Sequence, residues 1–373
     1  MKFPFAGGPA ACARALLATA AWLSGFIVTA WIAGRCLPPA ELPPVVWEKL
    51  DHLAAHGDEY DAIVLGSSRA QFQIMPSVFD EVAAGRGIAV KTFNAGVAAM
   101  GPPEDGYMLD EILRRPHRRL RWVVIEMAAI SSRMDAKQVG TSRFGYWHDW
   151  QRLILMTKRA RQQLREVQST AASRRRRPWL DRMGAYVAPV MLWMSHVESF
   201  AVRALDLGRA APLVVHLAMP DAPHPTAGTY GLGRFGDGWG YAGDEYQRMT
   251  GKILADYEQA HAERLQSPAR KDPHDAVSHE ALALMLAKVV RAGARPILFV
   301  PPVPSKKHYF PPRARERELT IFDFSDVREY PELFKMENRQ DTEHLNAAGA
   351  EVFSRILAQR FVGQVVQPSS LIP

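Results

Sequence analysis

Strand-length apolar runs alternate with amphipathic segments in two separate parts of the chain. The predicted strands are residues 61–66, 88–94, 121–126 and 295–300. The predicted helices are residues 76–84, 103–114, 278–292 and 346–360. Strands that alternate with helices usually pair in parallel, so this order predicts an α/β fold: a three-layer sandwich with a central parallel sheet and helices on both faces.

Residues 131–275 separate the two parts and differ from them in composition. They contain four consecutive arginines, residues 174–177, and a stretch rich in glycine and aromatic residues, residues 228–241. We interpret them as a large, mainly helical insertion over the active-site edge. Residues 186–205 are apolar but include a histidine, a glutamate and an arginine, which favours a packed or interfacial helix over a second membrane span. The arginines fit either a solvated loop or contact with lipid phosphates or an anionic polymer.

An uncharged apolar segment lies near the N-terminus. Residues 15–33 lie between Arg14 and Arg35, and a helix of this length nearly crosses a hydrocarbon core of about 30 Å. Acidic residues soon follow the segment, so we predict a single-pass anchor with a cytoplasmic N-terminus in the inner membrane and the body of the protein on the periplasmic or extracellular side. A cleaved signal peptide is the alternative, with residues 28–30 as the cleavage site.

Composition adds two constraints. The only cysteines, Cys12 and Cys36, flank the apolar segment, so the exported part contains no internal disulfide. The net charge of +7 would suit nucleic acid, but beside a membrane span it favours anionic lipid or an acidic envelope polymer, and we expect no nucleic-acid partner. The predicted organisation is a tail and anchor (1–36), a linker (37–56), a catalytic domain in two pieces (57–130 and 276–362), the insertion (131–275) and a tail (363–373).

A serine-containing turn follows the first predicted strand. Residues 66–69 read Gly-Ser-Ser-Arg, which places Ser68 where a helix begins at the carboxyl end of a strand. A serine there is either a helix cap or a nucleophile whose own N–H also stabilises an oxyanion. Gly96, after the second strand, is the expected second oxyanion donor, and Asn94 either adds a side-chain donor or caps the turn.

A base for this serine is available near the C-terminus. Asp341 precedes His344 by three residues on the loop that enters the last predicted helix. This spacing lets the carboxylate orient the imidazole while the other ring nitrogen faces the cleft as general base. Glu343 is an alternative orienting group, but its position next to the histidine gives poorer geometry. The sequence therefore predicts a catalytic set of Ser68, His344 and Asp341.

These blocks resemble those of the SGNH (GDSL-like) hydrolase family, whose fold is flavodoxin-like. Gly66-Ser67-Ser68 matches its first block, Gly96 its second-block glycine, and Asp341 with His344 its last block. The resemblance covers residues of about 60–130 and 280–360. The Gly-Ser-Ser block and the anchor are most similar to the envelope branch, which includes the teichoic acid D-alanyl transfer protein and alginate-type O-acetyltransferases.

The resemblance implies acyl transfer or ester hydrolysis on an envelope glycan or its lipid-linked precursor, with a membrane-bound O-acyltransferase as a partner. One block departs from the family: the third block usually supplies an oxyanion-hole asparagine, whereas here the third strand ends in Glu126. This departure supports the alternative of a catalytically impaired binding or scaffold protein. Loss of one oxyanion donor costs roughly 3–4 kcal/mol of barrier in other enzymes.

Other chemistry finds little support in the sequence. The chain has no CxxC, HExxH or phosphate-binding loop pattern, so we expect no metal and no cofactor. Trp239 and Tyr241, next to a glycine-rich stretch, and Arg69, next to the serine, are the candidate substrate-binding residues. A structural loop tip is the alternative interpretation for the two aromatic residues.

Overall fold

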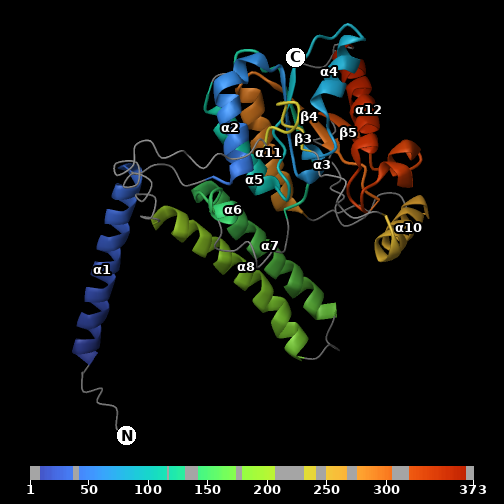
Figure 1. Cartoon of the computed structure of the whole chain (residues 1–373). Coiled ribbons are helices and arrows are strands. Elements are labelled where there is room, and N and C mark those ends of the chain that lie inside the picture. Colours follow the sequence, from blue (N-terminus) through green and yellow to red (C-terminus); the bar gives the residue numbers. More distant parts are fainter. Residues whose placement is uncertain are drawn as a thin grey trace. The chain divides into compact units, whose positions relative to one another are not determined.

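The chain forms two compact units in a computed structural model (Figure 1). The structure describes residues 9–36, 42–115, 117–130, 142–173, 179–205, 231–240, 249–266, 275–304 and 319–366. One unit comprises residues 1–42, 134–160 and 167–226, and the other comprises residues 43–133, 161–166 and 227–373. The region interpreted as an insertion, 131–275, is thus divided between the two units.

The larger unit contains a five-stranded parallel sheet, which confirms the predicted α/β class. Its strands are β1 (Ala62–Leu65), β2 (Thr92–Asn94), β3 (Trp122–Glu126), β4 (Arg295–Val300) and β5 (Thr320–Asp323). They are arranged in the order β2-β1-β3-β4-β5. The first four coincide with predicted strands. The fifth was missed because it is a four-residue edge strand that begins and ends with a polar residue, so it has no continuous apolar run.

Helices and 3₁₀ turns surround this sheet. The helices are α2 (Pro44–His56), α3 (Ser68–Gln71), α4 (Pro76–Ala84), α5 (Pro102–Leu113), α10 (Gly251–Gln266), α11 (Ala276–Arg291) and α12 (Ala347–Val366). The 3₁₀ turns are η1 (Gly57–Glu59), η5 (Pro331–Phe334) and η6 (Met336–Asn338). Proline occupies the first turn of α2, α4 and α5, where its missing N–H has no partner to lose.

The core of this unit is built from strand side chains and the faces of α4 and α12. These two helices contact each other (Figure 1). The centre of the Phe361 ring lies 5.1 Å from the centre of the Phe79 ring and 5.0 Å from that of the Trp122 ring. All five residues of β3 are buried. The buried strands hold their carboxyl ends in fixed positions, and the residues that follow β1 and β3 are therefore rigidly placed.

The smaller unit consists of helices α1 (Pro9–Cys36), α6 (Ser142–Gly145), α7 (Trp150–Ser173) and α8 (Trp179–Leu205), although residues 161–166 of α7 group with the sheet. Helix α1 contains Leu16–Ala33, a stretch long and apolar enough to cross a membrane or to serve as a signal sequence. No other helix of the described ranges meets the same criterion of length and composition. Helix α1 contacts α8 within this unit.

Candidate active site

The serine turn is a tight connection between β1 and the short helix α3. Gly66 has φ +156°, and a Cβ atom there would lie 2.6 Å from the Cβ atom of Glu126, so the position requires glycine. Ser67 is the N-cap residue of α3, and its Oγ accepts a hydrogen bond from the backbone N–H of Arg69 at 3.3 Å. Capping therefore falls to Ser67, and the hydroxyl of Ser68 is left for another role.

Ser68, His344 and Asp341 form a continuous chain of hydrogen bonds. Ser68 Oγ lies 2.7 Å from His344 Nε2, and His344 Nδ1 lies 2.8 Å from Asp341 Oδ2. When His344 Nδ1–H donates a hydrogen bond to the Asp341 carboxylate, the proton stays on Nδ1. The Nε2 atom then carries a lone pair that can accept the serine proton. Ser68 is only partly buried, and the side chains of His344 and Asp341 are 22% and 31% exposed, so a substrate can reach the serine.

The carboxylate of Asp341 is fixed by the backbone of its own loop. Its Oδ1 accepts hydrogen bonds from the N–H groups of Glu343, at 2.7 Å, and His344, at 2.8 Å. Burial alone would raise the pKa of Asp341, but the hydrogen bonds and charge of His344 and these two N–H groups hold the pKa below its ordinary value. Asp341 is therefore ionised at neutral pH, and it is Asp341 rather than Glu343 that bonds the imidazole.

Arg339 supports this loop through hydrogen bonds to backbone carbonyl oxygens, a role that no pattern in the sequence indicated. Its guanidinium donates to the carbonyl oxygens of Pro302, at 2.8 Å, and Thr342, at 3.0 Å. It also lies 5.5 Å from the centre of the Tyr257 ring. Because the side chain is almost fully buried, these bonds fix where the Asp341–His344 segment leaves the core.

The residues predicted as further oxyanion donors are engaged elsewhere. Asn94 is fully buried, and its Nδ2 donates to the carbonyl oxygens of Ala70, at 2.8 Å, and Ile74, at 2.7 Å. Its Oδ1 accepts the backbone N–H of Gly96 at 3.0 Å. The Asn94 amide therefore satisfies the carbonyls at the end of α3, and neither it nor the Gly96 N–H points at a substrate in this arrangement.

The backbone N–H of Ser68 is the remaining predicted donor. Within the described ranges it has no hydrogen-bond acceptor. It lies on the same residue as the hydroxyl that is predicted to be the nucleophile, which is the usual position of one oxyanion-hole donor. The site as built therefore offers one ready N–H group, and a second would require the Gly96 N–H to leave Asn94.

Lys49 of α2 ties the loop after β2 to the glycine-rich segment 231–240. Its side chain is completely buried, and its Nζ donates to the carbonyl oxygens of Asn94, Gly96 and Gly238 at 2.7–2.8 Å. Three acceptors match the three N–H groups of an ammonium ion. Burial lowers the pKa of Lys49 to about 7, although the carboxylates of Asp237 and Glu48 oppose this shift.

Glu126, at the end of β3, holds the serine turn from the other side. Its Oε2 accepts hydrogen bonds from Ser67, from the backbone N–H at 2.8 Å and from the Oγ at 2.9 Å. Its Oε1 lies 2.8 Å from Arg69 Nε. The side chain of Arg69, predicted to bind substrate, is 10% exposed and is paired with Glu126 beneath the turn in this structure.

A second buried carboxyl group, that of Asp105 in α5, lies near this ion pair. Burial first, and then the charge of Glu126, raise the pKa of Asp105 well above its ordinary value, while Arg69 opposes this shift. Glu126 is the carboxylate that pairs with Arg69 beneath the serine turn.

Of the two aromatic residues proposed to stack on sugars, the structure describes Trp239. Trp239 is 6% exposed, and its Nε1 donates to the carbonyl oxygen of Phe72 at 2.9 Å, so it is a packed residue rather than an open platform. Its neighbour Phe235 is 54% exposed and stacks on it at 6.1 Å. Tyr241 lies outside the described residues.

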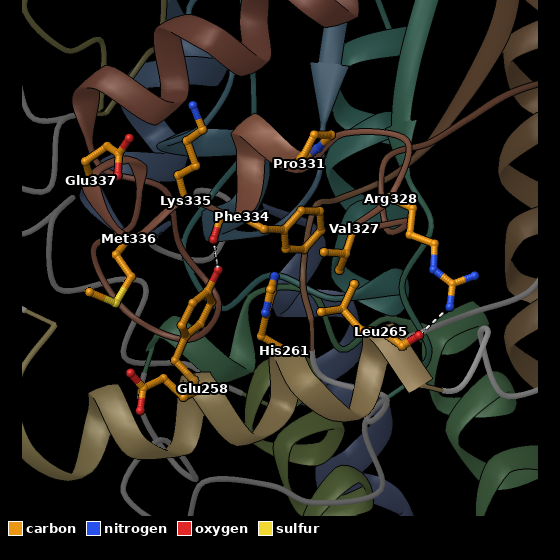
Figure 2. Close-up of a pocket in the computed structure, with 11 residues that line it drawn as sticks. Glu258, His261, Leu265, Val327, Arg328, Pro331, Phe334, Lys335, Met336 and Glu337 are labelled. Atoms are coloured by element: carbon orange, nitrogen blue, oxygen red, sulfur yellow. Dashed lines mark hydrogen bonds between the residues drawn. The ribbon is translucent and has the colours of Figure 1, made fainter.

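A cavity of about 730 Å³ lies away from the Ser68–His344 pair, between α10 and the segment after β5 (Figure 2). Figure 2 shows His261 and Leu265 of α10 facing Phe334 and Val327 across it. Tyr257 donates a hydrogen bond to the carbonyl oxygen of Phe334 at the wall of this cavity. Ser68, His344 and Asp341 are not among the residues that line this cavity.

Comparisons with known proteins leave this site as the main guide to function. No model of a known protein family matches the chain, and no curated protein matches its sequence. In the part of the chain that the structure describes, no group of three or more His, Cys, Asp or Glu side chains is placed to hold a metal ion.

Proposed function

We propose that this protein is a serine-dependent O-acyltransferase or esterase with an SGNH-type site. The observation that carries the proposal is the hydrogen-bonded chain from Ser68 through His344 to Asp341. The sheet order β2-β1-β3-β4-β5 supports it, because ligands of doubly wound sheets of this order bind beyond the carboxyl ends of strands β1 and β3. A three-layer SGNH-like sandwich is the arrangement that we propose for this unit.

The reaction begins with attack of Ser68 Oγ on the carbonyl carbon of an acyl ester while His344 Nε2 takes the hydroxyl proton. The tetrahedral oxyanion forms next to the Ser68 N–H, the bond to the leaving alcohol breaks, and His344 returns the proton to that alcohol. A sugar hydroxyl or water then attacks the acyl-enzyme and gives its proton to His344. Departure of Ser68 as the leaving group, which regains this proton, completes the cycle.

The substrate and location follow from the resemblance and from α1. We propose that α1 is a single-pass anchor in the inner membrane and that the sheet-containing unit acts on the periplasmic or extracellular side. The acceptor would be a cell-envelope polysaccharide or its lipid-linked precursor, and a membrane-bound O-acyltransferase would supply the acyl group. The apolar stretch Leu16–Ala33 supports the anchor.

Reaction of the purified full-length protein with p-nitrophenyl acetate tests the serine mechanism. We expect release of p-nitrophenol and an acetyl adduct on Ser68 by mass spectrometry, both lost in Ser68→Ala and His344→Ala. Ser77→Ala and His56→Ala, which change exposed residues outside the site, are the matched controls. Unchanged turnover in Ser68→Ala would overturn the proposal.

A non-catalytic binding or scaffold protein of an envelope polysaccharide system is the second candidate. It is favoured by one observation: the Gly96 N–H is bonded to Asn94, which leaves the oxyanion site with the Ser68 N–H alone among the predicted donors. An enzyme with a weakened oxyanion hole is slow. Absence of both adduct and turnover, together with retained binding of an envelope polysaccharide in Ser68→Ala, would establish this candidate.

A further inference from the structure

Helix α8 presents an apolar surface that no described part of the chain covers. Between residues 183 and 202 the exposed large side chains are those of Met183, Tyr186, Val187, Val190, Met191, Trp193, Met194 and Val202. Among the described side chains of the helix, Glu198 is the one that is both charged and exposed. We name this apolar surface the α8 face. Its apolar side chains are contiguous along the helix, whereas exposed apolar residues on an ordinary protein surface are scattered singly.

The opposite side of α8 is already occupied by packing within its unit. Leu192, His196 and Ser199 are buried at a helical spacing. His196 Nδ1 lies 2.8 Å from His148 Nε2. Farther along, Phe200 contacts the ring of Trp150, with 5.8 Å between ring centres. Helix α8 is therefore apolar on two sides, one packed and one open, a pattern typical of a helix that contacts lipid.

The surroundings of the α8 face indicate which occupant it suits. Helix α1, which carries the apolar stretch Leu16–Ala33, contacts α8 within the same unit. The part of α7 that belongs to the same unit, residues 150–160 and 167–173, has three basic residues and no acidic residue. The exposed ring of Tyr186 is of the kind enriched at the interface between lipid and water, and so is the ring of Trp193, whose Nε1 donates to Thr157 Oγ1 of α7 at 3.0 Å. A bilayer with anionic headgroups matches all three features.

We propose that α8 lies in the interfacial layer of the bilayer that α1 spans, with the α8 face directed toward the acyl chains. This inference rests on the membrane anchor of the proposed function. Because α8 carries Glu198 and Arg203 in its last two turns, it lies along the interface and does not cross the membrane. The helix thus adds a second contact with the membrane beyond the anchor.

Lipid quenching of fluorophores at single cysteines tests this placement in the full-length protein. The background variant is Cys12→Ser with Cys36→Ser, reconstituted into vesicles of phosphatidylglycerol and phosphatidylethanolamine. An environment-sensitive fluorophore is attached to Met191→Cys or Met194→Cys on the α8 face. Ile27→Cys in α1 is the control for the anchor, and Gln359→Cys, on the exposed side of α12, is the control for water.

The expected result is a loss of fluorescence at positions 27, 191 and 194 when the acyl chains are brominated, with no loss at position 359. Quenching of positions 191 and 194 by aqueous iodide, as at position 359, would overturn the inference while position 27 still reports the anchor. Protection of the α8 face from both quenchers would indicate a second copy or a protein partner and would also overturn it. Failure at position 27 would overturn the anchor and this inference together.

Discussion

One carboxylate oxygen of Glu126 accepts both the backbone N–H and the hydroxyl of Ser67, the residue that precedes the proposed nucleophile. The other carboxylate oxygen of Glu126 pairs with Arg69, the residue that follows Ser68. Glu126 therefore holds the serine turn on both sides of Ser68. It is a positioning residue, because it acts through the turn and does not contact the reacting atoms.

Glu126→Gln should destabilise the protein by about 3–5 kcal/mol, because it leaves the charge of Arg69 buried without a partner. The free energy of unfolding from denaturant titration measures this loss. Asp105→Asn is the matched control: burial raises the pKa of that carboxyl group well above its ordinary value, so its replacement by an amide should cost less, about 1 kcal/mol. Equal losses of stability in the two variants would show that Glu126 and Asp105 share the negative charge that pairs with Arg69. The double variant Glu126→Gln with Arg69→Met should recover much of the loss.

Asp341→Asn should lower kcat for p-nitrophenyl acetate by about three to four orders of magnitude, because an amide no longer selects the tautomer of His344 that can accept the serine proton. Steady-state kinetics measure the effect, and circular dichroism checks the fold. Glu343→Gln, two residues away, should change kcat little because Glu343 does not bond the imidazole. A large loss in Glu343→Gln with a small loss in Asp341→Asn would reverse the assignment.

Lys49 should make stability depend on pH. Its pKa is lowered to about 7 in the folded protein, so between pH 7 and about 10.5 the unfolded chain binds more protons. The free energy of unfolding should therefore rise with pH across this window, by at most about 1.4 kcal/mol per pH unit, and the unfavourable contribution is fully present below pH 7.

Lys49→Met should remove this slope, which denaturant titrations between pH 7 and 9.5 would detect. It should also destabilise the protein, since three buried carbonyl oxygens lose their donor at a cost of about 1–3 kcal/mol each. Lys252→Met, at an exposed position of α10, should retain the wild-type slope. The same slope in Lys49→Met and wild type would show that Lys49 does not cause it.

Arg339→Lys should reduce kcat more than it raises KM, because an ammonium group cannot span the carbonyl oxygens of Pro302 and Thr342 as the planar guanidinium does. The loop that carries His344 would then lose its support while the substrate surface stays intact. Kinetics at several substrate concentrations separate the two constants. Arg328→Lys, an exposed arginine at the cavity of Figure 2, should leave both constants unchanged.

The sheet and the Asp341–His344 pair could be predicted because each depends on a contiguous pattern. The run that became β3 is apolar over its whole length, and Asp341 and His344 are three residues apart. The roles of Lys49 and Glu126 depend instead on partners 45 or more residues away in the sequence. A carboxylate that closes a buried apolar strand was the one signal that could have indicated Glu126.

Asn94 shows why the oxyanion donors were harder to predict. A polar residue at the carboxyl end of a strand suggests a ligand, and Asn94 holds that position. The carbonyl oxygens of Ala70 and Ile74 are buried nearby, and a buried carbonyl without a donor is costly, so the amide is used inside the fold. Whether the Asn94 amide binds a ligand or these carbonyl oxygens depends on how α3 ends, and no local sequence pattern predicts that.

Ser68 and His344 meet although 276 residues separate them in the chain. The first strand of the sheet supplies one partner, and the loop before the last helix supplies the other. A ribosome must therefore complete most of the polypeptide before the two can touch, and one proteolytic cut followed by separation of the pieces would part them. If the serine is the nucleophile, hydrolysis of a chromogenic ester reports that the chain has been made at least as far as His344 and has folded.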